Sequence, residues 1–336
     1  WSSDVCSSDL KSKSWYRFDN KFRRLARLDL KQLKTFICVA ETGSLSAASD
    51  RLRLAQPALS RQIKLLEHKT GAQLFHRTVK GMTLTESGEK LLSRVSGIIR
   101  QLEQAVDEVR SSSESITGNV AIGLMPSINS VLAVRLIEKV KSELPQVTLR
   151  IVEGYSGHLI EWLHRGDLDI SFLYGPAHDL HLRCTGLLYE NIALISAPGK
   201  LNNLGKEIQL SDIAHLPIVL PSRPHGIRIL VDNAVAKAGV KLNVEISGDA
   251  FEVLKSLVKT GNYHAFIPLS AVNEDIREGT LEARTFISPT IKRQLVLAMA
   301  PDRKNTRAAQ ATLKIITSEI EKMVSEGIWS AELDAG

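Results

Sequence analysis

The residues best suited to chemistry in this chain are polar side chains on a short helix predicted to begin at Gln56. When such a helix lies in the major groove of DNA, Gln pairs with adenine, Arg with guanine, and Ser with base edges or phosphate. Residues of these types therefore predict a surface that reads DNA sequence. The candidates are Gln56, Ser60, Arg61 and Lys64, with Pro57 in the first turn of the helix.

Two short helices joined by a tight turn would position these side chains. A first helix over residues 45–52 offers Ala47, Ala48 and Leu52 for packing, and Pro57 suits the first turn of a second helix. On that second helix three apolar residues recur at i, i+4 and i+7 and are predicted to face the core: Leu59, Ile63 and Leu66. The pattern is typical of a helix-turn-helix, although a helix pair of this kind also serves plain core packing.

The charge distribution favours the DNA-binding interpretation. Residues 21–90 carry 14 Lys and Arg against 6 Asp and Glu, whereas residues 91–336 carry 26 against 28. The basic excess of the chain therefore coincides with the helix-turn-helix, as expected of a domain that neutralises phosphates.

Composition limits the remaining classes. A chain of 336 residues with 43% hydrophobic and 24% charged content can form two or three domains with proper cores. The three cysteines are far apart and form no CxxC pair, so we expect neither a disulfide framework nor a metal or cofactor site: Cys6, Cys38 and Cys184. No apolar run approaches the roughly 20 residues that span a bilayer, and we expect a cytoplasmic protein without membrane contact.

Residues 1–28 are expected to be an artefactual or disordered leader. Residues 2–10, SSDVCSSDL, resemble the translation of a short sequencing-library adapter, and the first clear helical pattern begins near Leu30. The alternative is a genuine basic arm that touches DNA.

A hairpin and a long helix follow the helix-turn-helix. Residues 74–85 form the predicted hairpin, or wing, with Gly81 at its tip and Arg77 positioned to contact DNA, and Thr85 can cap a helix that reaches about residue 110. The apolar residues of this helix have heptad spacing, which predicts a dimerisation seam. The alternative is an amphipathic helix that packs on its own domain. The seam residues are Leu91, Val95, Ile98, Leu102 and Val109.

Beyond residue 118 strands and helices alternate, which predicts an α/β module with a mainly parallel sheet. Predicted elements include a helix over 131–144, a strand over 191–197, a returning strand over 295–300 and a final helix over 307–325. Ser127 and Asn129 lie where a helix opens, and free backbone N–H groups there suit an anionic ligand. Ser222 and Arg223 lie on another loop that is expected to face the same cleft, although each of these residues also has an ordinary role as a helix cap or surface group.

These pieces, in this order, resemble the LysR-type transcriptional regulators, and more diffusely the nitrogen assimilation control regulators. The segment LKQLKTFICVAETGSLSAASDRLRLAQPALSRQIKLLEHKTGAQLFHRTVKGMTLTESGEKLL has the spacing of that family, including Phe36, Gly88 and the Gln56 to Glu67 segment. The resemblance implies a winged helix-turn-helix, a linker-helix dimer and a two-subdomain effector module like periplasmic binding proteins. It also implies that Ser127 and Ser156 stand where relatives bind effector carboxylates.

One segment departs from the family pattern. Where such modules often have Gly-x-Gly-Val/Ile-x-x-Leu-Pro, this chain has GNYHAFIP over residues 261–268, so that Tyr263 and His264 bring bulk and polarity. These two residues either contact the effector cleft or simply pack.

The predicted domains are a leader (1–28), a winged helix-turn-helix (29–88), a linker and dimerisation helix (89–117), an effector-binding domain (118–325) and a tail (326–336). We expect a transcriptional regulator that binds an inverted repeat of double-stranded DNA as a homodimer or homotetramer and answers to a small molecule, with RNA polymerase as a further candidate partner. A solute-binding or sensor module and a small-molecule enzyme are the alternatives. The usual catalytic motifs, among them GxSxG and HExxH, are missing from the sequence.

Overall fold

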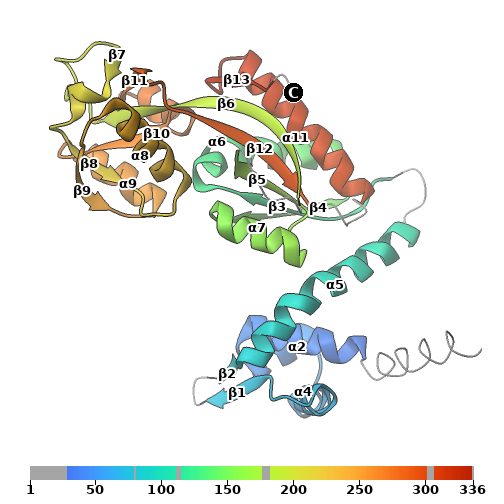
Figure 1. Ribbon diagram of the computed structural model, residues 1–336. Helices are drawn as coiled ribbons and strands as arrows, with labels where there is room; N and C mark the ends of the chain where they lie inside the picture. Colours follow the sequence, from blue (N-terminus) through green and yellow to red (C-terminus); the bar gives the residue numbers. More distant parts are fainter. Residues whose placement is uncertain (1–28, 79–80, 111–114, 176–181, 301–305, 335–336) are drawn as a thin grey trace, which may run out of the picture. The chain divides into compact units, whose positions relative to one another are not determined.

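The computed structural model describes residues 29–78, 81–110, 115–175, 182–300 and 306–334 (Figure 1). The chain divides into two compact units between Glu103 and Gln104, and each unit is described by itself. The predicted leader, with Cys6, lies outside the described residues. Within the described part no helix combines the length and apolarity needed to cross a membrane.

The first unit is a helix-turn-helix followed by a two-stranded wing. Its apolar core is formed where α2, α3 and α4 meet, and the predicted core residues Leu59, Ile63 and Leu66 are all buried. In α3 Ala48 is buried, whereas Ala47 is exposed. The elements are α2 (Leu30–Thr42), α3 (Leu45–Leu52), α4 (Gln56–Thr70), β1 (Phe75–Thr78), β2 (Gly81–Leu84) and α5 (Glu86–Arg110).

Helix α5 begins one residue after the predicted cap. The Thr85 hydroxyl accepts a hydrogen bond from the Gly88 backbone N–H at 3.0 Å, and the first turn carries Glu86 and Glu89. Both features stabilise the start of a helix, because they satisfy a free donor and oppose the positive end of the helix dipole.

The second unit contains two subdomains, each built on a sheet with a parallel core. In the first subdomain β3, β4 and β5 run parallel and β12 joins β5 antiparallel. Helices cover this sheet, and its core is one apolar cluster. The elements are β3 (Gly118–Leu124), α6 (Pro126–Glu143), β4 (Val147–Glu153), α7 (Ser156–Arg165), β5 (Ile170–Tyr174), β12 (Lys292–Met299), α11 (Arg307–Ser325) and β13 (Ala331–Leu333).

In the second subdomain β8, β9 and β10 run parallel, and both faces of the sheet are buried. Its elements are β7 (Glu207–Gln209), η1 (Leu210–Ile213), β8 (Pro217–Leu220), α8 (Gly226–Ala238), β9 (Asn243–Ser247), α9 (Phe251–Lys259), β10 (His264–Pro268), η2 (Leu269–Val272), α10 (Asn273–Arg277) and β11 (Glu282–Ser288).

Strand β6 (Arg183–Ser196) belongs to both subdomains. Its first half pairs antiparallel with β12 and β13, and its second half pairs with β10 and β11. Figure 1 shows it as a long curved strand that leads from one subdomain to the other. The sequence predicted only residues 191–197 of this strand, because a strand that changes partners midway has no single alternating pattern.

The C-terminal segment is part of the fold. Residues 326–336 were predicted as a tail, but Ala331–Leu333 form β13, which pairs with β6, and Trp329 is fully buried. A three-residue strand carries too little pattern to be predicted from sequence, and its register comes from the neighbouring strand.

Gly88 is expected to tolerate no side chain. A Cβ on Gly88 would lie 2.2 Å from the backbone oxygen of Leu74, whereas a Cβ on Gly157, also near the start of a helix, would meet nothing within 4 Å. Gly88→Ala should therefore lower the free energy of unfolding of the first unit by about 1–3 kcal/mol, despite the higher helix propensity of Ala. Gly157→Ala is the matched control and should change stability by no more than about 1 kcal/mol, in the stabilising direction. Equal effects of the two substitutions in denaturant unfolding would contradict the close packing at Gly88.

Candidate functional site

The predicted DNA-reading side chains lie on the outer face of α4. Gln56, Pro57, Arg61 and Lys64 are exposed, and Ser60 is half-buried, while the opposite face of the same helix is buried. In the described part of the chain no acidic side chain forms an ion pair with Arg61 or Lys64. Both cations are therefore available to bases or phosphates.

The side chain of Arg77 on β1 contacts α4, the helix that carries the predicted DNA-reading residues. Its Nη2 donates a hydrogen bond to the Ser60 hydroxyl at 2.9 Å, which ties the wing to α4. A groove of about 310 Å³ lies between the two elements, and His76 contributes to it, a residue that the sequence analysis did not single out. The groove is lined by Ile63, Lys64, Glu67, Gln73, Phe75, His76, Arg77 and Met82.

The predicted seam on α5 divides into two parts. Leu91 and Val95 pack against the core of the helix-turn-helix, as the alternative interpretation expected, because the first turns of α5 lie on that domain. Farther along, Ile98 is 60% exposed and Leu102 is 45% exposed. Val106, from the second stripe of the same helix, is 41% exposed, and the side chain of Val109 lies outside the described residues.

The second unit contains a cleft whose lining comes from both subdomains. An outer pocket of about 440 Å³ adjoins an inner recess of about 20 Å³, and the same four residues line both: Tyr155, Tyr174, His225 and Asp249. The outer pocket is large enough for a small metabolite, whereas the inner recess has room for about one water molecule or one ligand oxygen atom.

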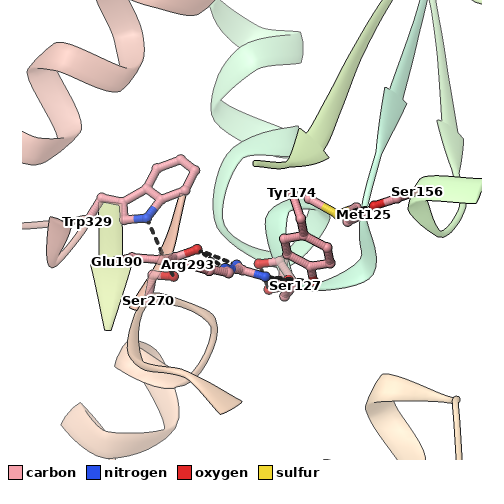
Figure 2. Close-up of polar contacts among 9 residues, drawn as sticks. Met125, Ser127, Ser156, Tyr174, Glu190, Ser270, Arg293 and Trp329 are labelled. Atoms are coloured by element: carbon pink, nitrogen blue, oxygen red, sulfur yellow. Dashed lines mark hydrogen bonds and ion pairs between the residues drawn. The ribbon is translucent and has the colours of Figure 1, made fainter. Parts of the chain in front are cut away.

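Ser127 lies on the wall of the inner recess, but it is not a helix cap. The residue before α6 is Met125, which makes no side-chain capping hydrogen bond, and Ser127 is the second residue of the helix. The Ser127 hydroxyl instead accepts a hydrogen bond from Arg293 Nη1 at 3.0 Å, and the same nitrogen donates to the Tyr174 hydroxyl at 2.7 Å. Figure 2 shows Arg293 between Ser127 and Tyr174 on one side and Glu190 on the other.

Arg293 and Glu190 form a buried ion pair where β6 and β12 meet. The two residues are directly opposite each other in the antiparallel register, and both side chains have at most 1% of their surface exposed. Arg293 Nε donates to Glu190 Oε1 at 2.5 Å. The other carboxylate oxygen, Oε2, accepts from Trp329 Nε1 at 3.1 Å and from the Ser270 hydroxyl. Glu190 is thus held by three groups that are distant in sequence.

Of the other predicted effector residues, some line the outer pocket and one lies outside both pockets. Ser156, Ser222 and Arg223 line the outer pocket. Asn129 lines neither pocket, and its Nδ2 donates to Glu153 Oε2 at 2.8 Å. Arg223 forms an ion pair with Asp232 at 2.8 Å, and the same carboxylate also pairs with Arg228 at 3.0 Å.

Tyr155 and Asp249 close the cleft between the subdomains. The Tyr155 hydroxyl donates a hydrogen bond to the backbone oxygen of Asp249, and Asp249 Oδ1 accepts from the Ser222 backbone N–H at 2.8 Å. Burial, with the negative charge of Asp249, raises the pKa of the Tyr155 phenol and keeps it a donor. A contact of this kind breaks if the subdomains separate.

His225 stands at the start of α8 and lines both pockets. Its Nδ1 accepts a hydrogen bond from the Ile227 backbone N–H at 3.2 Å, which places the proton of the neutral ring on Nε2. Burial lowers the pKa of His225 below its ordinary value of 6.5, and Arg293 acts in the same direction, although Asp249 opposes them. The ring is therefore neutral near pH 7.

Tyr263 and His264 line neither pocket. His264 is buried in β10, where burial lowers its pKa, and Tyr263 packs against the core on one face of the second subdomain. Of the two interpretations of these residues, the structure favours packing.

The sequence analysis missed Arg293, Glu190, Tyr174, His225 and Asp249. A signal existed for Arg293, because it is in phase with Leu295 and Leu297, which face the core on the same strand. A charged residue in that phase predicts a buried ion pair. For the other four no local pattern marks the role, because their partners come from other strands and loops.

Comparison with known proteins identifies both units. Residues 30–89 match the family model of the bacterial regulatory helix-turn-helix proteins of the lysR family, and residues 113–321 match the LysR substrate binding domain. The chain is 28% identical over 304 residues to the HTH-type transcriptional regulator BbuR of Bordetella bronchiseptica, covering 90% of this chain and 93% of the relative. It is also 28% identical over 300 residues to the nitrogen assimilation regulatory protein Nac of Escherichia coli, covering 89% and 97%.

Solved structures share the fold. CbnR, a LysR family transcriptional regulator, has a TM-score of 0.69 at 18% identity, over 87% of this chain and 99% of that one. Full-length CbnR in complex with its target DNA has a TM-score of 0.67 at 19% identity, over 88% and 99%.

Arg61 and Arg77 should respond differently to substitution. Arg61→Ala is expected to cost about 1–3 kcal/mol on a preferred operator and much less on random DNA, because a groove contact carries sequence information. Arg77→Ala should weaken binding to both DNAs alike and lower the salt slope by about one unit, because a phosphate contact releases counterions whatever the sequence. Fluorescence anisotropy over a salt series measures both quantities. If Arg61→Ala lost the same binding free energy on both DNAs, Arg61 would contact the DNA phosphate backbone and not the bases.

His225 should make the stability of the second unit depend on pH. Because its pKa is lowered in the folded state, the unfolded chain binds this proton first as the pH falls. The contribution of His225 is therefore constant above about pH 6.5, and the free energy of unfolding decreases below that pH. His225→Asn keeps a capping acceptor but does not titrate, so its Tm should fall less than that of the natural chain between about pH 7.5 and pH 5.5. His264→Asn, at another described histidine whose pKa burial lowers, is the comparison. An unchanged pH dependence in His225→Asn would contradict the assignment.

Proposed function

The chain belongs to the LysR family of DNA-binding transcriptional regulators, and from that premise we propose that it binds an interrupted inverted repeat as a homo-oligomer held by α5 and answers to a small molecule in the cleft of its effector-binding domain. It is a regulator rather than an enzyme. We propose that it acts on chromosomal DNA in the cytoplasm. The bound regulator would change transcription through contact with RNA polymerase.

One observation carries the DNA-binding part of the proposal. Helix α4 buries one face and presents Gln56, Arg61 and Lys64 to solvent on the other. Surface helices in general carry a polar outer face, but the face of α4 presents Gln and Arg, the residue types that pair with adenine and guanine when a helix enters the major groove. Arg77 on the wing adds a cation beside the same helix.

The dimer is supported by the apolar stripe on α5. Ile98, Leu102 and Val106 follow one another at intervals of four residues, and each is more than 40% exposed. Large apolar side chains in one row on a helix are costly in water, so a second copy of the helix is the natural cover. The seam is therefore proposed to run through these three residues, beyond the part of α5 that Leu91 and Val95 attach to the helix-turn-helix. A dimer places two recognition helices side by side and so requires two half-sites in the DNA.

The effector part rests on the cleft of the second unit. Its outer pocket of about 440 Å³ lies between two subdomains, which is where small-molecule sites commonly occur. Contacts that join the subdomains across the cleft, such as Tyr155 with Asp249, would be altered by a ligand between them. A ligand that binds one arrangement more tightly than another shifts the balance between the two, and this supplies a means of regulation.

Charges placed in the α5 stripe should abolish both the dimer and tight operator binding. In Ile98→Asp with Leu102→Asp, each carboxylate would be buried unpaired in the seam at a cost of several kcal/mol. Ile98→Leu with Leu102→Ile keeps the apolar area and is the matched control. Sedimentation velocity, with affinity for an operator selected from a random-sequence library, should give monomers and weak binding for the first variant and a native oligomer for the second. A dimer of native affinity in the aspartate variant would overturn the proposed seam.

A further inference from the structure

The carboxylate of Asp249 gives the cleft a negative charge. Among the described residues that line the inner recess or the outer pocket, Asp249 is the only acidic one, and it lines both. The residue is exposed, so a molecule that enters the outer pocket can reach its side chain. The charge of Asp249 is therefore available to a ligand.

This charge is not balanced within the protein in the way that its neighbours are. In the part of the chain that the structure describes, no lysine or arginine forms an ion pair with Asp249. By contrast, the buried carboxylate of Glu190 pairs with Arg293. Arg223, the cation that lines the outer pocket, forms its ion pair at 2.8 Å with Asp232, which lines neither pocket. A cationic group of a ligand would supply the partner that Asp249 lacks among these residues.

Hydrogen bonds hold the carboxylate of Asp249 in place and leave much of it free to bind. Its Oδ1 accepts a hydrogen bond from the Ser222 backbone N–H at 2.8 Å, and its backbone oxygen accepts one from the Tyr155 hydroxyl. No other described residue donates to the side chain. An ionised carboxylate has two oxygens with about four acceptor positions, so one bond from Ser222 orients the group and leaves most of its capacity for donors of a ligand.

Three aromatic rings line the cleft together with Asp249: Tyr155, Tyr174 and His225. The ring centroids of Tyr155 and His225 are 5.1 Å apart, and those of Tyr174 and His225 are 6.2 Å apart, so the rings form one group. The face of a tyrosine ring attracts a cation, and a carboxylate attracts it more strongly. Together they suit an ammonium group, whose three N–H groups are all donors.

We propose that Asp249 is the binding group for an ammonium group of the effector, and that the cleft takes a small amine whose carbon skeleton packs against the tyrosines of the outer pocket. This inference rests on the proposed effector function of the cleft. Asp249 belongs to the second subdomain, whereas Tyr155 and Tyr174 belong to the first. An amine bound in this way contacts both subdomains and stabilises the arrangement in which Tyr155 and Asp249 meet.

Three small probes that share a ring and differ in charge test the proposal: benzylamine, benzyl alcohol and benzoate. A ring suits the outer pocket, because aromatic side chains line it. Ligand-observed NMR on the full chain measures Kd values, which are on the order of 10 mM for fragments of this size. Benzylamine should bind about threefold to tenfold more tightly than either of the other probes, the gain expected of an ion pair and a ring contact in a pocket open to water.

A salt series tests the ion pair without any substitution. Raising NaCl from about 0.05 M to about 1 M screens charges that are exposed to solvent. The preference for benzylamine over benzyl alcohol should therefore fall at least about twofold, because the neutral probe forms no ion pair. This measurement keeps the proposal open to contradiction even if a variant at Asp249 does not fold.

Asp249→Asn separates the charge of this residue from its structural role. The amide oxygen still accepts the Ser222 hydrogen bond and the backbone contact with Tyr155 is kept, but the negative charge is lost. The preference for benzylamine over benzyl alcohol should fall to about twofold or less. The matched control is Glu252→Gln in α9, which removes an equal charge from a side chain that lines neither pocket. It should keep the natural preference, and both variants should keep native operator affinity.

Each part of the proposal has a result that would overturn it. Benzyl alcohol or benzoate binding as tightly as benzylamine in the natural chain would contradict the ammonium site, while the effector cleft would stand. A preference for benzylamine that salt does not change, or that Asp249→Asn retains, would remove Asp249 from recognition, and so would an equal loss in Glu252→Gln. No binding by any probe up to about 50 mM, several times the expected Kd, would contradict the effector cleft itself, leaving operator binding as a separate test of the DNA-binding function.

Discussion

The buried ion pair between Arg293 and Glu190 is the interaction on which the effector-binding domain depends. Two charges inside a protein are costly unless they are paired and their remaining hydrogen-bonding capacity is satisfied. Strands β6 and β12 place the two residues directly opposite each other, and Trp329 and Ser270 complete the carboxylate. The short C-terminal strand and the last buried tryptophan are therefore part of the same arrangement that shapes the recess at Ser127.

The same pair is linked to the second subdomain, because Glu190 accepts a hydrogen bond from Ser270 in η2. Glu190 lies on the strand that passes from one subdomain to the other, while Tyr155 and Asp249 meet across the cleft. Ser127, on the wall of the recess, accepts a hydrogen bond from Arg293, so the recess is joined to the ion pair. In the first unit the physical division is simpler. Helix α4 buries one face in the core and exposes the other, and α5 carries an exposed apolar stripe beyond its contact with the helix-turn-helix.

Local sequence features predicted those parts of the structure that follow from periodicity or from a single residue type. The spacing of Leu59, Ile63 and Leu66 predicted the buried face of α4. The concentration of Lys and Arg in the same part of the chain predicted that this domain binds DNA. The long helix with Thr85 at its start, and the alternation of strands and helices, follow from patterns of the same kind. Ser127 was singled out because it lies near the opening of a helix, and the structure places it at the inner recess.

The sequence by itself therefore determined the family, the buried face of α4 and the general α/β architecture. Only the tertiary structure decided what surrounds the cleft. Arg293, Glu190 and Trp329 are separated by long stretches of chain, and no local pattern states which buried cation meets which buried anion. The tertiary structure also divided the predicted α5 seam. Leu91 and Ile98 have the same heptad spacing, but Leu91 packs against the core of the helix-turn-helix, whereas Ile98 is exposed. Periodicity specifies which face of an element is apolar, whereas the partner of that face is set by packing between elements distant in sequence.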